Sequence, residues 1–119
     1  MAKLDMDGPF ELSNRVIDTK VSANLIGNYA LGYMNSNGKF VVKVVGRADS
    51  DLRRELKAAR KKYRGGFLSR IFGGETLDRF KFSYADSVDA AYQAECRAFE
   101  AFGGTAKLRN NVKPVPPTA

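Results

Sequence analysis

The stretch that decides the fold reads Gly27-Asn-Tyr-Ala-Leu-Gly-Tyr-Met34, then Asn35-Ser-Asn-Gly38, then Lys39-Phe-Val-Val-Lys-Val-Val-Gly46. The first and third runs are rich in aromatic and β-branched residues, which favour strands. The run between them ends in Asn-Gly, the dipeptide that most strongly favours a tight turn between antiparallel strands. The sequence therefore predicts a β-hairpin, and the other elements follow from it along the chain.

An amphipathic helix is predicted directly after the hairpin. The pair Asp49-Ser50 provides side-chain oxygens suited to cap its first turn. Its apolar positions fall at helical spacing and comprise Leu52, Leu56, Ala59 and Tyr63. Its outer face is basic and carries Arg53, Arg54, Lys57, Arg60, Lys61 and Lys62, with Glu55 as the main acid. Like charges one turn apart destabilise the helix, and an anionic partner would relieve this cost.

A third strand and a second helix are predicted further along the chain. Phe80-Lys-Phe-Ser-Tyr84 alternates aromatic and polar side chains, as a half-buried strand does. Asp86 or Ser87 is suited to cap a helix that runs to about Phe102, where Gly103-Gly104 ends it. The predicted fold class is α+β, with a small antiparallel sheet of about three strands, including the hairpin, flanked by helices.

The chain has 119 residues, the size of one domain, so we expect a single core within residues 15–113. Residues 1–14 mix Asp, Gly and Pro with isolated apolar side chains and are expected to form a loosely held arm. Residues 64–78 are interpreted as an irregular insertion between glycines. Residues 114–119 are rich in proline and are expected to be extended and exposed.

The composition narrows the function classes. With 20 Lys and Arg against 13 Asp and Glu, the formal charge is +7, which attracts phosphate polyanions. Cys96 is the only cysteine, which excludes a disulfide framework and a multi-cysteine zinc site. The lack of histidine excludes Ser-His-Asp and Cys-His catalysis, so any catalysis must use carboxylate, Tyr, Lys or Arg side chains. No stretch is apolar enough for a leader or a membrane span, so we expect a cytoplasmic protein without stable membrane association.

Three residues stand out as candidate site residues. Glu95 lies beside the apolar stripe of the second helix, where its carboxylate loses water and needs a cation, a metal or a hydrogen-bond donor. From helical geometry alone we favour a structural role, as a residue at the rim of the core or as the partner of an internal arginine, over a metal ligand. Arg47, between the hairpin and the basic helix, is a phosphate contact, a solvated loop residue or the partner of Glu95. Tyr29 is most simply a core aromatic whose hydroxyl reaches the surface.

The order of these residues and their neighbours resembles the GIY-YIG endonuclease family over roughly residues 27–116. The segments that carry the resemblance are Gly27-Asn28-Tyr29, Val44-Val45-Gly46 with Arg47, Asp51-Leu-Arg-Arg-Glu-Leu56, Phe80-Lys-Phe-Ser-Tyr84, Ala90-Ala-Tyr-Gln-Ala-Glu-Cys96 and Leu108-Arg-Asn-Asn-Val-Lys-Pro114. This ordered series is more specific than any single short signature. The resemblance implies a metal-dependent endonuclease that hydrolyses phosphodiester bonds of nucleic acid, with DNA favoured.

The resemblance also implies roles for individual residues. Glu95 would hold one Mg²⁺ or Mn²⁺ ion, which polarises the phosphate. Arg47 would neutralise charge on the phosphoryl oxygens, and Tyr29 would position or activate the attacking water. Asn110 would shape the site by hydrogen bonding. The residues predicted to contact nucleic acid are Arg53, Arg54, Lys57, Arg60, Lys61, Asn110 and Lys113. A homodimer that cuts two strands is compatible with this assignment but is not required by it.

The chain also departs from the family pattern. Val44 stands where the second signature has tyrosine, and Asn28 stands where the first has an apolar residue. Arg109 and Lys113 stand where an acid and a histidine are expected. These changes keep a second hypothesis open, in which a catalytically decayed module binds nucleic acid or a nucleoprotein partner without cutting it.

Residues 64–78 carry an apolar and basic cluster. Its members are Phe67, Leu68, Ile71 and Phe72, with Arg64 and Arg70. One interpretation is a contact with a membrane surface or a partner protein. The interpretation that we prefer is a satellite core that folds back onto the domain. In a nuclease without a separate reader domain, loops such as this one would supply any sequence preference.

Overall fold

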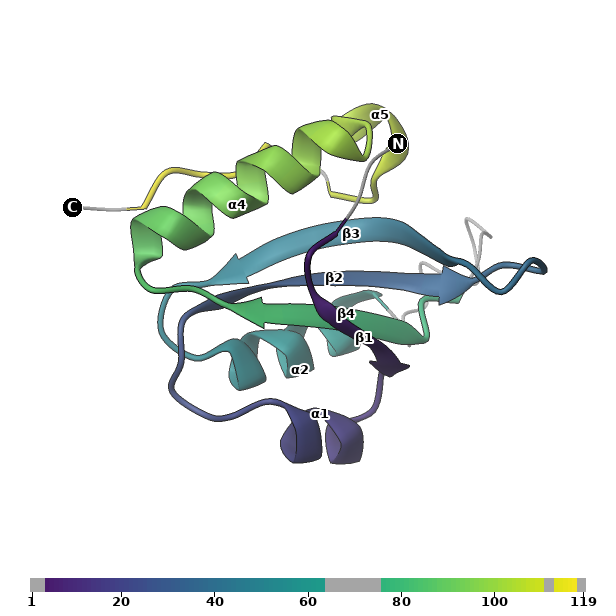
Figure 1. Cartoon of the computed structure of the whole chain (residues 1–119), viewed down its shortest axis with the longest axis horizontal. Helices are drawn as coiled ribbons and strands as arrows, with labels where there is room; N and C mark the ends of the chain where they lie inside the picture. The colour runs from purple at the N-terminus through teal and green to yellow at the C-terminus, as the bar shows by residue number, and fades with distance from the viewer. Residues whose placement is uncertain (1–3, 64–75, 111–112, 118–119) are drawn as a thin grey trace.

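The computed structural model describes residues 4–63, 76–110 and 113–117, which form a four-stranded antiparallel sheet with helices on both faces (Figure 1). The elements in chain order are β1 (Asp7–Glu11), α1 (Asn14–Lys20), β2 (Gly27–Met34), β3 (Phe40–Ala48), α2 (Leu52–Tyr63), β4 (Arg79–Tyr84), α4 (Val88–Ala101) and α5 (Gly104–Lys107). The strand order is β1-β4-β2-β3, so β3 is an edge strand. α1 and α2 cover one face and α4 covers the other, which confirms the predicted α+β class.

The predicted hairpin is confirmed. β2 and β3 pair in antiparallel fashion, with Tyr29 opposite Gly46. In the turn, Asn35 accepts hydrogen bonds through Oδ1 from the backbone N–H groups of Asn37 and Lys39, at 2.9 and 3.0 Å. The glycine that follows Asn37 has a φ of 76°, in the left-handed region that only glycine enters without strain. The Asn-Gly pair therefore closes the hairpin as its residue types predict.

β1 is an additional strand that the sequence does not predict. It falls within residues 1–14, which were expected to be a loose arm, and it pairs in antiparallel fashion with β4. Phe10 packs against Phe80 and Phe82, with ring centroids 5.6 and 6.0 Å away. The expectation of an arm is wrong for β1 because a short run containing Gly8-Pro9 shows no strand periodicity, and its partner strand lies far along the chain.

α2 has the predicted length and apolar face, but a different residue caps it. Asp51, rather than the pair Asp49-Ser50, accepts through Oδ1 from the backbone N–H of Arg54 at 3.2 Å. The carboxylate of Asp49 is bonded to Arg47 instead. The predicted apolar positions that are buried are Leu52, Leu56 and Ala59. Asp49 does not cap the helix because its carboxylate is bonded to Arg47, and Asp51, nearer the helix, takes its place.

β4 and α4 also confirm the prediction. Ser87, one of the two predicted caps, accepts through Oγ from the backbone N–H of Ala90 at 3.0 Å. The buried residues of α4 are Ala91, Ala98 and Phe99, which form the side that lies on the sheet. Gly103 has a φ of 97°, a left-handed conformation that ends α4 before the short α5.

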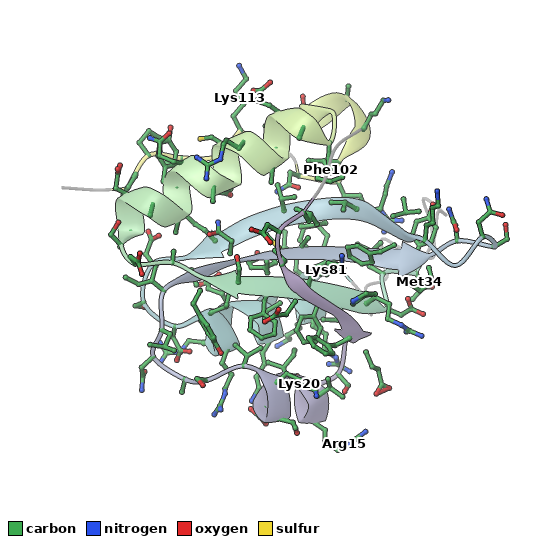
Figure 2. All side chains as sticks on the ribbon, viewed as in Figure 1. Arg15, Lys20, Met34, Lys81, Phe102 and Lys113 are labelled. Carbon is green, nitrogen blue, oxygen red and sulfur yellow. The ribbon has the colours of Figure 1, made fainter. Side chains whose placement is uncertain are left out.

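The size of the chain predicts one core, but the sheet divides the buried apolar residues into two cores, one on each face. The core under α1 and α2 includes Ile17, Leu31, Val44, Leu56 and Phe80. The core under α4 includes Ala30, Val45, Phe99 and Leu108, with Phe102 packed against it above the sheet in Figure 2. Alternate side chains of β2 enter opposite cores, so Tyr29 faces α2 while Asn28 faces α4. Side chains from the two faces can therefore meet only around an edge of the sheet.

The predicted insertion at residues 64–78 is described only in part. Its apolar and basic cluster falls within residues 64–75, which lie outside the described residues. In the C-terminal segment, residues 113–117 have no regular secondary structure. Among the residues that the structure describes, no helix combines the length and the apolar character needed to cross a membrane.

Candidate active site at the edge of the sheet

The candidate site lies at the β3 edge, where α2 and α4 approach from opposite faces of the sheet (Figure 1). A cavity of about 450 Å³ opens there. Tyr29 from β2, Arg47 from β3 and Glu95 from α4 all line it. The other lining side chains that carry polar groups are Glu55, Lys62, Tyr63 and Asn110. The three predicted catalytic residues thus face one cavity, although they come from three elements and from both faces of the sheet.

The centre of the site is an ion pair between Arg47 and Glu95. Arg47 Nη1 donates to Glu95 Oε1 at 2.8 Å, and Arg47 Nε donates to Asp49 Oδ1 at 2.8 Å. The side chains of Arg47 and Glu95 are only 11% and 12% exposed. The guanidinium also lies over the ring of Tyr92, 5.1 Å from its centroid. Of the two structural roles predicted for Glu95, the structure shows the pairing with an internal arginine.

Burial affects the titration of both partners. It raises the pKa of Glu95, and the hydrogen bond and charge of Arg47 offset only part of this rise. Burial also acts to lower the pKa of Arg47, but the hydrogen bonds to Asp49 and Glu95 outweigh it, so this pKa is raised. The guanidinium is therefore always charged. Ionised Glu95 is incompletely compensated and gains from any further cation that enters the cavity.

Tyr29 is held over the β3 backbone by the glycine opposite it. A Cβ on Gly46 would overlap the ring and the hydroxyl of Tyr29, so only glycine leaves room for the phenol. Tyr29 is 8% exposed. Burial raises the pKa of its phenol well above the usual value, and the nearby Glu55 and Tyr63 raise it further. Tyr29 is thus a neutral hydrogen-bonding group at physiological pH, not a phenolate.

Asn110 closes the free edge of β3. Its Nδ2 donates to the carbonyl oxygen of Val45 at 2.7 Å, and its Oδ1 accepts from the Val45 N–H at 3.0 Å. Next to it, the backbone N–H of Arg109 donates to the carbonyl oxygen of Lys43 at 2.7 Å. The side-chain amide replaces a neighbouring strand at this edge. Asn110 therefore lines the cavity, and both polar atoms of its amide are bonded to the backbone of Val45.

Residues 113–115 lie beside a second compartment of the site. This hollow of about 350 Å³ shares Arg47, Glu55 and Glu95 with the main cavity. Lys113, one of the residues predicted to contact nucleic acid, lines its wall. The C-terminal segment therefore brings a further positive charge to the site.

The basic face of α2 divides between two directions. Arg53 and Lys57 turn toward α1, and Arg60 turns toward Leu12, between β1 and α1. Arg53 Nε donates to the carbonyl oxygen of Val21 at 2.7 Å, and Lys57 Nζ lies 2.6 Å from Asp18 Oδ1. Three of the residues predicted to follow a nucleic-acid backbone thus bind the protein itself, and two of them join α2 to α1 in the lower layer of Figure 1.

The remaining cations of α2 are placed differently. The side chain of Arg54 is 79% exposed, and Lys61 is exposed as well. Lys62 reaches the candidate site and lies 5.1 Å from the ring centroid of Tyr63. The cation of this helix that lines the candidate cavity is therefore one that the predicted contact set omits.

Four residues of the site were not predicted as site residues. They are Glu55, Lys62 and Tyr63 on α2 and Tyr92 on α4. The available signal was helical spacing. Tyr92 precedes Glu95 by three positions, so the two share a side of α4, and Glu55 and Lys62 are two turns apart on one side of α2. This spacing becomes informative only when the neighbours of each helix are known.

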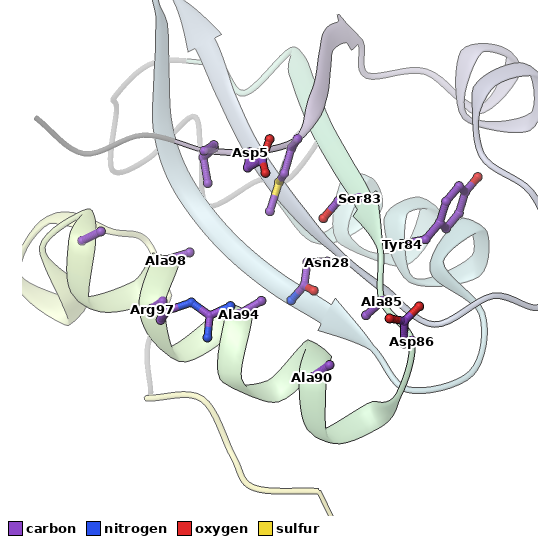
Figure 3. A pocket seen from close by; sticks show the side chains of 13 residues that line it. Asp5, Asn28, Ser83, Tyr84, Ala85, Asp86, Ala90, Ala94, Arg97 and Ala98 are labelled. Carbon is purple, nitrogen blue, oxygen red and sulfur yellow. The ribbon is translucent and has the colours of Figure 1, made fainter.

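A larger cavity of about 670 Å³ lies on the other side of α4 (Figure 3). The cavity is open because the side chains of α4 that line it are mostly alanines. Residues 4–6 and β4 form its other walls. Asn28 lines it, is 2% exposed, and donates through Nδ2 to the carbonyl oxygen of Ala91 at 2.8 Å. This polar residue ties β2 to α4. None of the three predicted catalytic residues lines the larger cavity, so the candidate site is the one at the β3 edge.

Comparison of the chain with family models, with curated proteins and with solved structures finds no match.

The carboxylates of the candidate site are few. Within the described part of the chain, no group of three or more His, Cys, Asp or Glu side chains is arranged to hold a metal ion. The cavity itself contains the two carboxylates Glu55 and Glu95. A cation there would take one or two protein ligands and fill its other positions with water and substrate oxygens, which is the usual coordination of Mg²⁺ at phosphate sites. The residues present fit such an ion.

Proposed function

We propose that this chain is a metal-dependent endonuclease of the GIY-YIG type, which hydrolyses phosphodiester bonds of nucleic acid, with DNA as the favoured substrate. The observation that carries the proposal is that Tyr29, Arg47 and Glu95 line one cavity. Convergence of a hydroxyl, a guanidinium and a carboxylate on one hollow is the geometric criterion for a catalytic assignment. The positive charge and the lone Cys96 fit a cytoplasmic protein that acts on nucleic acid.

Glu95 is the residue that would hold Mg²⁺ or Mn²⁺. Arg47 uses one of its carboxylate oxygens, Oε1, which leaves the other available. When bound, the ion polarises the phosphate and stabilises the leaving oxygen. A divalent cation also compensates the carboxylate that burial disfavours, so metal affinity is coupled to the burial of Glu95.

The other side chains act through charge and position. Arg47 is held by Asp49 and Glu95, and this preorganised guanidinium neutralises charge on the phosphoryl oxygens without moving. Tyr29 orients the attacking water through its neutral hydroxyl. Lys62 and Lys113 line the two compartments and are placed to contact the phosphates that flank the scissile bond.

The alternative is a module that binds nucleic acid without cutting it. Two observations favour it. Val44, where the family signature has tyrosine, is 1% exposed and belongs to the core under α2. The 2.8 Å ion pair also lets Arg47 and Glu95 neutralise each other without any ligand. In this alternative the cations of the site bind phosphates, and no metal is needed.

The deciding experiment measures nicking of supercoiled plasmid and cleavage of short labelled DNA and RNA, with Mg²⁺, with Mn²⁺ and with chelator. The variants are Glu95→Ala and Glu95→Gln, the second of which keeps an oxygen that accepts from Arg47. Glu100→Gln is the matched control, because this exposed glutamate lies on α4 outside the site. Binding of the same substrates is followed by fluorescence anisotropy in chelator.

Metal-dependent cleavage by the wild type and Glu100→Gln, lost in both Glu95 variants, is the expected result. Salt-sensitive binding with no cleavage by any of the four proteins would instead establish the binding module. Cleavage that survives in Glu95→Ala would contradict the assigned role of Glu95.

A further inference from the structure

The site contains a second carboxylate, Glu55, to which the proposed mechanism has so far given no catalytic role. Glu55 lines both compartments of the site and is exposed. Among the described residues, its carboxylate takes part in no ion pair, whereas Glu95 and Asp49 are both bonded to Arg47. Glu55 is therefore the acid of the cavity that remains able to accept a proton or a hydrogen bond from a bound molecule.

The sequence of α2 explains why this carboxylate faces open space. Glu55 and Lys62 stand two turns apart on the side of α2 that borders the cavity. Between them this side presents Ala58 and Ala59, whose small side chains leave room for water and a phosphate group. The buried side of the helix is fixed by Leu56 and its apolar neighbours, so Glu55 is held at the rim by the packing of α2.

The attacking water in a phosphodiester hydrolysis must lose a proton, and the cavity offers few acceptors. Glu95 is committed to Arg47 through one oxygen. Tyr29 is a poor base because burial raises the pKa of its phenol, so the phenolate is scarcely populated. Glu55 and Tyr29 line the same cavity, and the charge of Glu55 also raises the pKa of Tyr29, so the two groups interact electrostatically.

We propose, on the basis of the hydrolytic function argued above, that Glu55 is the general base of this site. The water oxygen forms a bond to phosphorus while the bond from phosphorus to the leaving oxygen breaks. One proton of the water passes to the Glu55 carboxylate, and the leaving oxygen takes a proton from solvent. Tyr29 keeps the water in place during this step but does not ionise.

The test compares Glu55→Gln with Glu100→Gln in metal-dependent cleavage of a short labelled DNA duplex. Loss of a positioned general base lowers kcat by about 10²–10⁴-fold. KM and the affinity for DNA in chelator are expected to stay within about twofold, because Glu55 does not bind the substrate in the ground state. The melting temperature should also be unchanged, since the side chain is exposed and unpaired among the described residues.

A second variant separates a base from a merely structural residue. Glu55→Ala removes the carboxylate from the exposed rim of the cavity, where a small carboxylate from solvent can take its place. Added formate is therefore expected to restore part of the cleavage by Glu55→Ala, while chloride at the same ionic strength is not. Failure of formate to restore any activity overturns the role of Glu55 as a base.

The remaining outcomes distinguish the two proposals. Cleavage by Glu55→Gln at the wild-type rate overturns the base assignment and leaves the nuclease intact. A fall in kcat/KM that comes from KM alone also overturns it, because Glu55 would then hold the substrate. No cleavage by the wild type with either metal overturns the nuclease proposal and this one with it.

Discussion

At the scale of single residues, the ion pair between Arg47 and Glu95 sets the electrostatics of the site. Arg47→Met keeps most of the side-chain stem but removes the charge, so burial is no longer offset and the pKa of Glu95 is expected to rise further. Titration of the Glu95 carboxyl carbon by NMR checks this shift. Arg54→Met is the matched control, because that side chain is 79% exposed. An unchanged titration of Glu95 in Arg47→Met would contradict the prediction.

The same variant should change how stability depends on pH. Because the pKa of Glu95 is raised in the folded state, its contribution to stability is full below the ordinary pKa of a glutamate and is lost as pH rises through the raised value. Arg47→Met is expected to raise the pKa of Glu95 further. The melting temperature of the variant should therefore lie below that of the wild type, by a difference that grows from acid to neutral pH. An uncompensated charge in a buried pair costs about 3 kcal/mol near neutral pH.

Gly46 makes a second prediction at this scale. Gly46→Ala places a methyl group where the ring of Tyr29 lies, so we expect a loss of about 2 kcal/mol of unfolding free energy. The measurement is chemical denaturation. In a Tyr29→Ala background the ring is absent, and Gly46→Ala should then cost much less. Equal costs in the two backgrounds would show that the ring does not determine the need for glycine.

The sequence indicates Tyr29, Arg47 and Glu95, which line one cavity, but not the side chains that line it with them. These three residues lie in the segments that resemble the GIY-YIG family, and the resemblance singles them out where each local pattern alone is weak. Glu55 and Lys62 are not singled out, because a charged residue on the flank of an amphipathic helix looks the same whether it meets solvent, another helix or a cavity. Their assignment needed the position of α2 relative to β3.

At the scale of elements, the start of α2 predicts a pH effect of the opposite sign. Burial acts to raise the pKa of Asp51, but hydrogen bonds from the backbone of Asn24 and Arg54 outweigh it and the pKa is lowered. Its contribution to stability is therefore present above the ordinary pKa of an aspartate and is lost as pH falls through the lowered value. Asp51→Ala should lower the melting temperature at neutral pH, and the difference should narrow in acid.

The control for the cap is Ser50→Ala. The sequence alone favours the pair Asp49-Ser50 as the cap, whereas the structure assigns the hydrogen bond to Asp51. Thermal unfolding at neutral pH should therefore be affected by Asp51→Ala and hardly at all by Ser50→Ala. A larger fall in melting temperature for Ser50→Ala than for Asp51→Ala would instead support the cap that the sequence predicts.

Local signals also explain which elements were predictable. The hairpin, β4 and α4 each contain their own periodicity and their own turn or cap residues, and all three were predicted. β1 became a strand only through pairing with β4 and the packing of Phe10. Likewise the buried side of α2 was predicted, but which flank meets α1 and which meets the cavity depends on the tertiary arrangement.

At the scale of the whole molecule, the site exists because the sheet ends at β3. Tyr29 reaches it from the α2 face and Glu95 from the α4 face, and only an edge strand lets side chains from both faces share one hollow. Asn110 satisfies the free edge of that strand, so the C-terminal segment and Lys113 are brought to the same place. Lys62 and Lys113, which are far apart in the sequence, therefore both line the site.

Under the proposed function, the positions of these cations predict which lysines bind nucleic acid. Lys62 and Lys113 line the site, whereas Lys57 lies 2.6 Å from Asp18 on the side facing α1. Lys62→Ala and Lys113→Ala should each weaken binding of a short DNA duplex and reduce the slope of log affinity against log salt by about 0.9. Fluorescence anisotropy in chelator measures the affinity without cleavage.

Lys57→Ala is the control, because a lysine already paired within the protein releases few counterions from DNA. An equal effect of Lys57→Ala would move the binding surface to the outer face of α2, where the sequence alone predicts it.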